Sequence, residues 1–231
     1  QLNFIKNKKM EIFEKFKHII SKSDNPIVLE FGTCEGDQTK IMIEYLKLLN
    51  RKFIYHAFEP NKNLKTDFFN RNGDYIKDGL LDFYEYAIGN IDGECDFHVS
   101  SGKKYEDGKF ITSYHGSSSI KQPQIILREY PDIKFELSKT NVIKLDTHYN
   151  NSILKGKKID FIWADVQGAE KDMIRGGMET FTNHVKYLYT EYIDGYSYSD
   201  KINISEILEL LPYYEVVKDD GGDVLLKNTK L

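Results

Sequence analysis

Two apolar segments, each with an acid and a glycine turn at its end, constrain this chain most. The first covers residues 26–31 and runs into Gly32 and Gly36, and the second covers residues 159–165 and runs into Gly168. Near-continuous apolar runs of this length are typical of parallel strands that are covered on both faces. Ligands of such sheets bind beyond the carboxyl ends of the strands. The two segments therefore predict a nucleotide-like ligand at one edge of a parallel sheet.

Length and composition fit one α/β domain with a full-sized core, because the chain has 231 residues of which 40% are hydrophobic. Cys34 and Cys95 do not make a disulfide framework, so we expect a reducing compartment and a cytoplasmic location. No apolar stretch approaches the roughly 20 residues that span a bilayer, and the start lacks a signal-peptide pattern. The net charge of -4 argues against nucleic acid as a partner. Composition leaves the oligomeric state open.

Hydrophobic periodicity predicts alternating strands and helices with a closing hairpin. A leading helix is expected over residues 7–21, packed as an N-terminal segment (1–25) on the main domain (26–231). Strands are predicted at 27–31, 53–58, 81–87, 159–165 and 185–191, and a hairpin at 213–227 with Gly221 and Gly222 near its turn. The helix from Asp37 is expected to bury Ile41, Tyr45 and Leu48, and Asn61 to cap the next helix. A hairpin strand is expected at 94–99, and an irregular insertion at about 100–140 that acts as a lid or is disordered.

The first glycine turn favours a ligand that carries an amine. Gly32 and Gly36 alone do not make the G-x-G-x-x-G pattern that a pyrophosphate requires, and Glu30 would place negative charge beside phosphates. An acid there suits the methionyl end of S-adenosylmethionine. Glu59, after the second strand, is placed to accept hydrogen bonds from a ribose diol.

The motifs at residues 29–32, 57–61, 87–89, 116–119, 145–146 and 165–170 resemble, in order, those of FkbM-type methyltransferases. The blocks Phe-Glu-Pro-Asn and Asp-Val-Gln-Gly-Ala-Glu are the specific ones. The chain departs from the family at Glu30 and Thr33-Cys34, where Asp and Ala-Asn are more common, and at Gln167, where Glu is common. The resemblance implies a Rossmann-like class I methyltransferase domain. Its mostly parallel seven-stranded sheet would end in an antiparallel hairpin and carry helices on both faces.

The resemblance also implies S-adenosylmethionine as methyl donor and O-methylation of a hydroxyl on a sugar, a glycan or a related natural product. The cofactor-binding residues that it implies are Glu30, Gly32, Thr33, Gly36, Glu59, Ala87, Asp165 and Gln167.

A sugar hydroxyl is a poor nucleophile, so a base is expected near the acceptor. The catalytic candidates are Asp165, His115 and Glu191, and the acceptor-binding candidates are Ser118, Asp194, Tyr192 and Tyr196. The site is expected to work without a metal; the alternative is a divalent cation at Asp165 and Glu191.

Simpler interpretations stand beside these. Asp165 could merely cap the helix that opens at Gly168, His115 could be an ordinary loop residue, and the tyrosines could form a small hydrophobic cluster. Two other functions also remain open: RNA 2'-O-methylation, and a non-catalytic module that keeps the fold to bind a glycan or a protein.

Overall fold

A computed structural model describes residues 2–106, 109–124, 126–192, 198–199 and 202–231. Its centre is a seven-stranded sheet with the strand order β11-β12-β10-β9-β1-β2-β3. Strands β10, β9, β1, β2 and β3 pair in parallel, and β12 runs antiparallel to both β10 and β11. The predicted fold, a mostly parallel sheet closed by an antiparallel hairpin, is confirmed.

The strands are β1 Ile27–Phe31, β2 Ile54–Phe58, β3 Asp82–Tyr84, β4 Ala87–Gly89, β5 Gly93–Ser101, β6 Lys103–Glu106, β7 Lys109–Ser113, β8 Lys134–Lys144, β9 Phe161–Ala164, β10 Tyr187–Glu191, β11 Tyr214–Asp219 and β12 Asp223–Asn228. The helices are α1 Leu2–Ile20, α2 Asp37–Leu48, α3 Lys65–Lys77, α4 Ile126–Glu129, α5 Leu145–Asn151, α6 Glu170–Arg175, α7 Met178–His184 and α8 Ile204–Leu210, with 3-10 turns η1 Lys62–Leu64 and η2 His115–Ser117. None of the described helices is long and apolar enough to cross a membrane.

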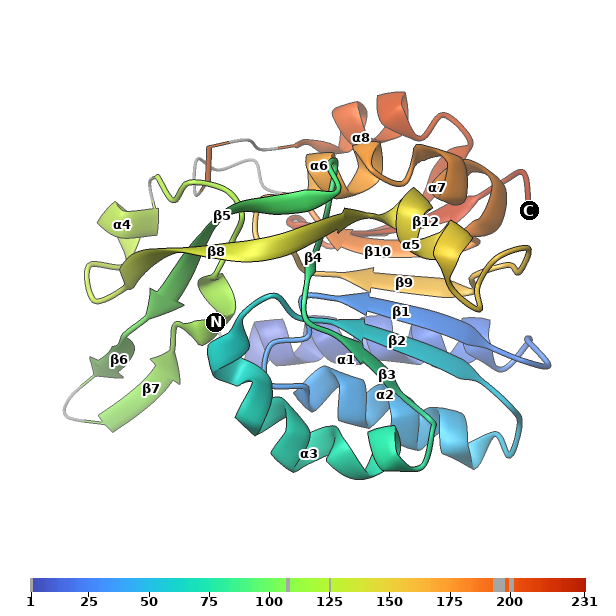
Figure 1. Cartoon of the computed structure of the whole chain (residues 1–231), viewed down its shortest axis with the longest axis horizontal. Coiled ribbons are helices and arrows are strands. Elements are labelled where there is room, and N and C mark those ends of the chain that lie inside the picture. The colour runs from blue at the N-terminus through green and yellow to red at the C-terminus, as the bar shows by residue number, and fades with distance from the viewer. Residues whose placement is uncertain (1, 107–108, 125, 193–197, 200–201) are drawn as a thin grey trace.

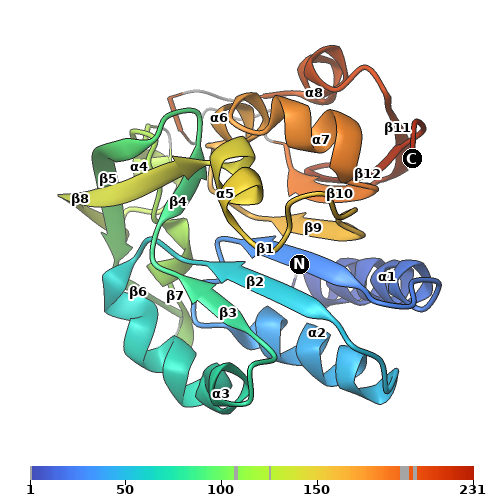
Figure 2. The ribbon, with the colours of Figure 1, turned by 45° about the vertical axis from the view of Figure 1, so that its right-hand side comes forward.

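Helices cover both faces of the central sheet, as Figures 1 and 2 show. Helices α1, α2 and α3 pack on one face, around a core that includes Phe16, Met42 and Phe68. Helices α5 to α8 pack on the other face, around a core that includes Met173 and Phe181. Alternate residues of each strand contribute to the two cores, because successive side chains of a strand point to opposite faces.

The register of the three middle strands brings their ends together. Phe31, the last residue of β1, pairs with Phe58 of β2 on one side and with Ala164 of β9 on the other. The next residues of the chain, Gly32, Glu59 and Asp165, therefore emerge at one point of the sheet edge. This adjacency is the reason that the acids identified in the sequence can share one site.

A second sheet stands over the carboxyl ends of the parallel strands (Figures 1 and 2). It has the order β4-β8-β5, with β5 antiparallel to β8 over the register from Gly93↔Val142 to Ser101↔Lys134. Strands β6 and β7 form a two-stranded hairpin that continues from it. The small sheet places residues far apart in sequence above the site.

The structure corrects several local predictions. The strand expected at 81–87 is divided: β3 pairs with β2, whereas β4 starts at Ala87 and pairs with β8 in the small sheet. The insertion at about 100–140 is not irregular, since it contains β6, β7 and most of β8. The strand expected at 94–99 exists as β5, and its partner is β8.

The buried face of α2 also differs from the prediction. Ile41 and Leu48 are 49% and 81% exposed, whereas Met42, Ile43 and Leu46 are buried. Both stripes recur at helical spacing, so periodicity alone could not choose between them. Asn61 does cap the following turn, because its side-chain oxygen accepts a hydrogen bond from the Asn63 amide.

Candidate active site

The turn after β1 comes very close to the end of β9. Gly32 has φ +78, and a Cβ built on it would lie 1.9 Å from the backbone carbonyl oxygen of Asp165. The Gly32 amide donates to the Phe58 carbonyl, and the Asp165 amide donates to the Phe31 carbonyl. The turn ends at Gly36, which has φ +81 and precedes α2. Only glycine at position 32 permits this approach of the two strand ends.

Glu59 lies beside this turn, and both of its carboxylate oxygens accept a backbone hydrogen bond. Oε2 accepts from the Cys34 amide at 2.8 Å, and Oε1 accepts from the Asn61 amide at 2.8 Å. Burial raises the pKa of Glu59 to about 7, against the effect of these two hydrogen bonds. An ionised carboxylate has about four lone-pair sites, so each oxygen can accept one further hydrogen bond from a ligand.

Asp165 follows β9 and lies against the side chain of Gln167. The Gln167 Nε2 donates to Asp165 Oδ1 at 2.5 Å and lies 3.5 Å from Glu191 Oε2. The Gln167 Oε1 accepts from the Tyr198 hydroxyl at 3.3 Å. The structure thus brings together three of the predicted residues: Asp165, Gln167 and Glu191.

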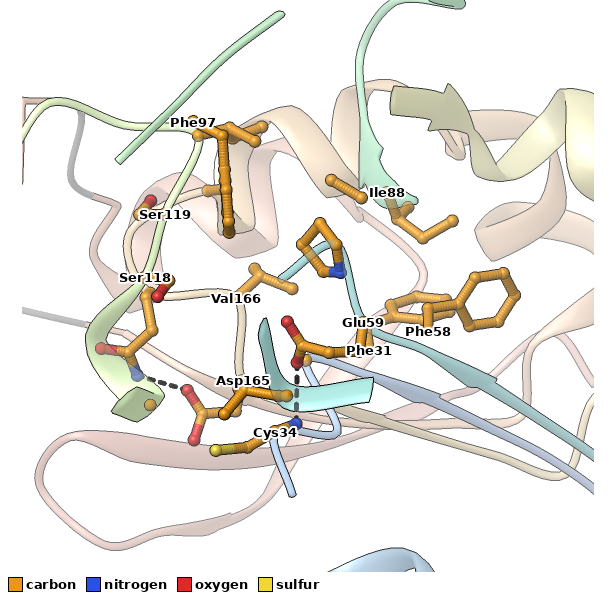
Figure 3. A pocket seen from close by; sticks show the side chains of 18 of the residues that line it. Phe31, Cys34, Phe58, Glu59, Ile88, Phe97, Ser118, Ser119, Asp165 and Val166 are labelled. Carbon is orange, nitrogen blue, oxygen red and sulfur yellow. Dashed lines mark hydrogen bonds between the residues drawn. The ribbon is translucent and has the colours of Figure 1, made fainter. Parts of the chain in front are cut away.

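Asp165 and Gln167, but not Glu191, line a pocket of about 250 Å³ between the central sheet edge and the small sheet. Figure 3 shows Glu59 and Asp165 facing the pocket, with the Phe97 ring of β5 lying across it from Asp165. Aromatic and aliphatic side chains make up most of the remaining wall. The lining residues are Phe31, Gly32, Cys34, Phe58, Glu59, Pro60, Leu64, Tyr86, Ala87, Ile88, Phe97, His115, Gly116, Ser118, Ser119, Ile120, Asp165, Val166, Gln167 and Ala169. No lysine or arginine is among these described lining residues.

Glu30 does not line the pocket. Its carboxylate points into the core beneath α2, where it accepts hydrogen bonds from the hydroxyls of Thr39 at 2.6 Å and Tyr55 at 2.5 Å. Strand alternation explains this direction, because Val28 two residues earlier faces the same core. Burial raises the pKa of Glu30 to about 7, and the nearby Asp165 charge adds to the effect. Contact between Glu30 and a cofactor amine stays a prediction.

Thr33, the next residue of the turn, is only 4% exposed, and its hydroxyl has no hydrogen-bond partner among the described residues. A buried hydroxyl of this kind is available to a ligand or an ordered water. Thr33 and Gly36 lie outside the pocket wall, whereas Ala87 lies in it.

Ser118 is a structural connection between the two sheets. Its hydroxyl oxygen accepts hydrogen bonds from the Asn61 Nδ2 at 3.1 Å and from the Ser100 amide at 3.0 Å. The same hydroxyl donates a hydrogen bond to the His115 carbonyl oxygen at 3.2 Å. These contacts leave the Ser118 hydroxyl little capacity to bind the substrate that accepts the methyl group. His115 is half-buried and borders the pocket, which keeps it within reach as a base.

The remaining predicted residues fall into two groups. Tyr192 is buried in the core with α8, and its hydroxyl donates to Asp219 at 2.6 Å, so its ring packs inside the protein. Asp194 and Tyr196 lie outside the described residues, so their predicted contacts with an acceptor stay predictions. No group of three or more His, Cys, Asp or Glu side chains within the described ranges is placed to hold a metal.

Sequence reasoning missed the hydrophobic wall of the pocket. Phe97 and Ile120 come from the insertion and its flanking strand, and Tyr86 and Ile88 come from the segment that joins the two sheets. The available signal was the alternation around Phe97, which predicted a strand but not its position above the site. Their position depends on the long-range pairing of β5 with β8.

A Rossmann-like sheet of this strand order, with acids at the ends of β2 and β9 and a hydrophobic pocket above them, defines the class I methyltransferase fold. The comparisons with known proteins agree: the family described as "Methyltransferase FkbM domain" matches residues 30–219. The chain is also 33% identical over 227 residues to the 2-O-methyltransferase NoeI of Sinorhizobium fredii (strain NBRC 101917 / NGR234), covering 96% of this chain and 87% of that protein.

Among solved structures, the methyltransferase FkbM from Methylobacillus flagellatus KT superposes with a TM-score of 0.51 at 14% identity. The match covers 88% of this chain and 44% of that one, so the chain spans less than half the length of that structure. The chain belongs to the FkbM methyltransferase family. This membership implies an S-adenosylmethionine-dependent methyltransferase.

Proposed function

We propose that this protein transfers a methyl group from S-adenosylmethionine to a hydroxyl of a sugar or glycan. The observation that carries the proposal is the pocket at the sheet edge, which Glu59 and Asp165 both line and whose described wall contains no lysine or arginine. The 33% identical relative, whose name is a 2-O-methyltransferase, supports a hydroxyl as the acceptor.

The residues present fit the cofactor. Gly32 permits close approach to the backbone, the Thr33 hydroxyl is buried without a described partner, and Glu59 can accept two further hydrogen bonds, as a ribose diol requires. Acids in a wall whose described residues include no lysine or arginine favour a ligand of positive charge over a diphosphate. When bound, S-adenosylmethionine supplies a methyl group on a positively charged sulfur.

The protein's part in the reaction is alignment and removal of a proton. Asp165 lines the pocket and accepts a hydrogen bond from Gln167, whose Nε2 also lies 3.5 Å from Glu191 Oε2. We assign to Asp165 the removal of the proton from the acceptor hydroxyl. His115 borders the same pocket and is the second candidate for this role. The Phe97 ring and its apolar neighbours exclude water from the site. A positioned base contributes about 10²-fold or more to such a step.

The residues of the pocket wall argue against RNA as the methyl acceptor. RNA recognition depends on basic side chains that neutralise phosphates. The described wall contains no lysine or arginine, and the chain carries a net charge of -4.

The test has a binding arm and a turnover arm. Saturation with S-adenosylhomocysteine at 100 times its dissociation constant should stabilise the protein by about 2.7 kcal/mol, which a thermal melt detects. Incubation with methyl-labelled S-adenosylmethionine and a panel of neutral glycans, followed by mass spectrometry, should show labelled sugar. The Asp165→Asn variant serves as the control. Labelling of RNA or protein with no labelled glycan would contradict the assigned acceptor class.

A further inference from the structure

The side chain of Gln167 lies between two carboxylates at the edge of the pocket. Its Nε2 is 2.5 Å from Asp165 Oδ1 and 3.5 Å from Glu191 Oε2. The residue itself has φ +52, a left-handed conformation that non-glycine residues seldom adopt. The tight turn therefore aims this one side chain at both acids.

The orientation of the carboxamide follows from its other end. Gln167 Oε1 lies 3.3 Å from the Tyr198 hydroxyl, whose single hydrogen is shared between this oxygen and the closer Ser117 carbonyl at 2.7 Å. A carboxamide has one acceptor oxygen and an NH₂ group with two donors. With the oxygen at Tyr198, both donors are directed towards the carboxylates.

Two carboxylates at one site repel each other unless a proton, a cation or a donor separates them. In many proteins a bound divalent cation has this role. We infer that the Gln167 carboxamide takes the place of a cation between Asp165 and Glu191, and so positions Asp165 at the pocket without a metal. The kinetic part of this inference rests on the proposed function; the cation-binding part does not.

The charge-changing variant Gln167→Glu provides the binding test. It would put three carboxylates at one point, which is the oxygen-rich ligand set that Ca²⁺ and Mn²⁺ favour. We expect Ca²⁺ to bind this variant with a dissociation constant of about 10⁻⁴ M, the tight end of the range for extracellular modules, and at least about ten-fold more tightly than the wild type. Calorimetric titration with CaCl₂ and with MnCl₂ measures this, without any need for turnover.

Matched variants separate the site from a general charge effect. Gln124→Glu adds the same charge at an exposed position outside the pocket, and should bind Ca²⁺ no better than the wild type. Adding Glu191→Gln to Gln167→Glu should abolish the gained binding. Gln167→Met keeps the length of the side chain but removes the donors, so it should lower kcat and leave the protein without a cation site.

Two results would overturn the inference. One is saturable Ca²⁺ or Mn²⁺ binding by the wild-type protein that Asp165→Asn removes, since the Gln167 oxygen would then be a metal ligand. The other is a folded Gln167→Glu variant with unchanged cation affinity. If that variant does not fold, the methyl-transfer activity of the wild type in EDTA tests the inference instead. Activity that is lost in EDTA and restored by Mn²⁺ contradicts a metal-free role for Asp165, whereas activity unchanged by EDTA supports it. Absence of any methyl transfer would contradict the proposed function alone.

Discussion

Substitution of Gly32 by alanine tests the closest approach in the site. The new Cβ would lie 1.9 Å from the carbonyl oxygen of Asp165 and 3.0 Å from its carbonyl carbon. Both atoms belong to the backbone, so no side chain can move aside. Gly156 provides a control, because its φ of +79 matches the +78 of Gly32 and a Cβ added there would meet nothing within 4 Å.

The two substitutions separate the cost of the dihedral from the cost of the contact. A left-handed alanine costs about 1–2 kcal/mol, and the lower entropy of the unfolded chain returns about 0.4–1 kcal/mol. Gly156→Ala should therefore destabilise by about 1 kcal/mol. Gly32→Ala must in addition separate the turn after β1 from the end of β9, which should add about 1–3 kcal/mol, as overpacking does. Because Asp165 would move with its carbonyl, cofactor affinity should fall at least about ten-fold, or about 1.4 kcal/mol.

Urea unfolding of the two variants and the wild type measures the difference in unfolding free energy, and calorimetry with S-adenosylhomocysteine measures the affinity. Equal destabilisation by the two substitutions, with cofactor affinity retained in Gly32→Ala, would refute the argument that Gly32 is required by contact with Asp165.

Three further predictions concern the acids. Glu59→Gln should weaken binding of S-adenosylhomocysteine at least about ten-fold. The Glu59 carboxylate accepts hydrogen bonds from two backbone amides, and a carboxamide would present its NH₂ donor group to one of them. Unchanged affinity in calorimetry would count against Glu59 as the ribose ligand. Asp165→Asn should lower kcat about 10²-fold in the glycan methylation assay with cofactor affinity within a few-fold, and full turnover would remove Asp165 from the mechanism. The pKa of Glu59 is raised from 4.5 to about 7, so between these pH values the folded state holds a proton that the unfolded state releases. The stability that this proton contributes is fully present below pH 4.5 and is lost as the pH rises from 4.5 through about 7. Thermal melts between pH 4.5 and 8 should show a smaller loss for Glu59→Gln than for the wild type, and equal losses would contradict the shift.

The sequence predicted the residues at the sheet edge because they follow local rules. Apolar strands located β1 and β9, and the block after β2 placed Glu59 at the strand end and Asn61 at the cap. The wall above the site followed no such rule. Strand β5 at Gly93–Ser101 finds its partner at Lys134–Lys144, across a long intervening segment, and no local pattern encodes that register. The interpretation of residues 100–140 as irregular was wrong for this reason, and Phe97 was missed with it.

Glu30 shows a different limit of prediction from sequence: a motif does not reveal which face of the sheet a strand residue points to. Its place in the motif predicted contact with the cofactor, whereas strand alternation turns its carboxylate to Thr39 and Tyr55 beneath α2. From there the carboxylate can still act on the pocket through charge, because Asp165 raises the pKa of Glu30 and the interaction is mutual.

The acids around the turn behave as one electrostatic unit. Burial raises the pKa values of Glu30, Glu59 and Glu170 to about 7, and in each case the charge of Asp165 contributes. A cationic ligand beside Asp165 would favour ionisation of all three, so its binding should release protons near pH 7. A neutral ligand of the same shape would release fewer. The buried acids thus favour a positively charged methyl donor over its neutral product, through charge as well as through contact.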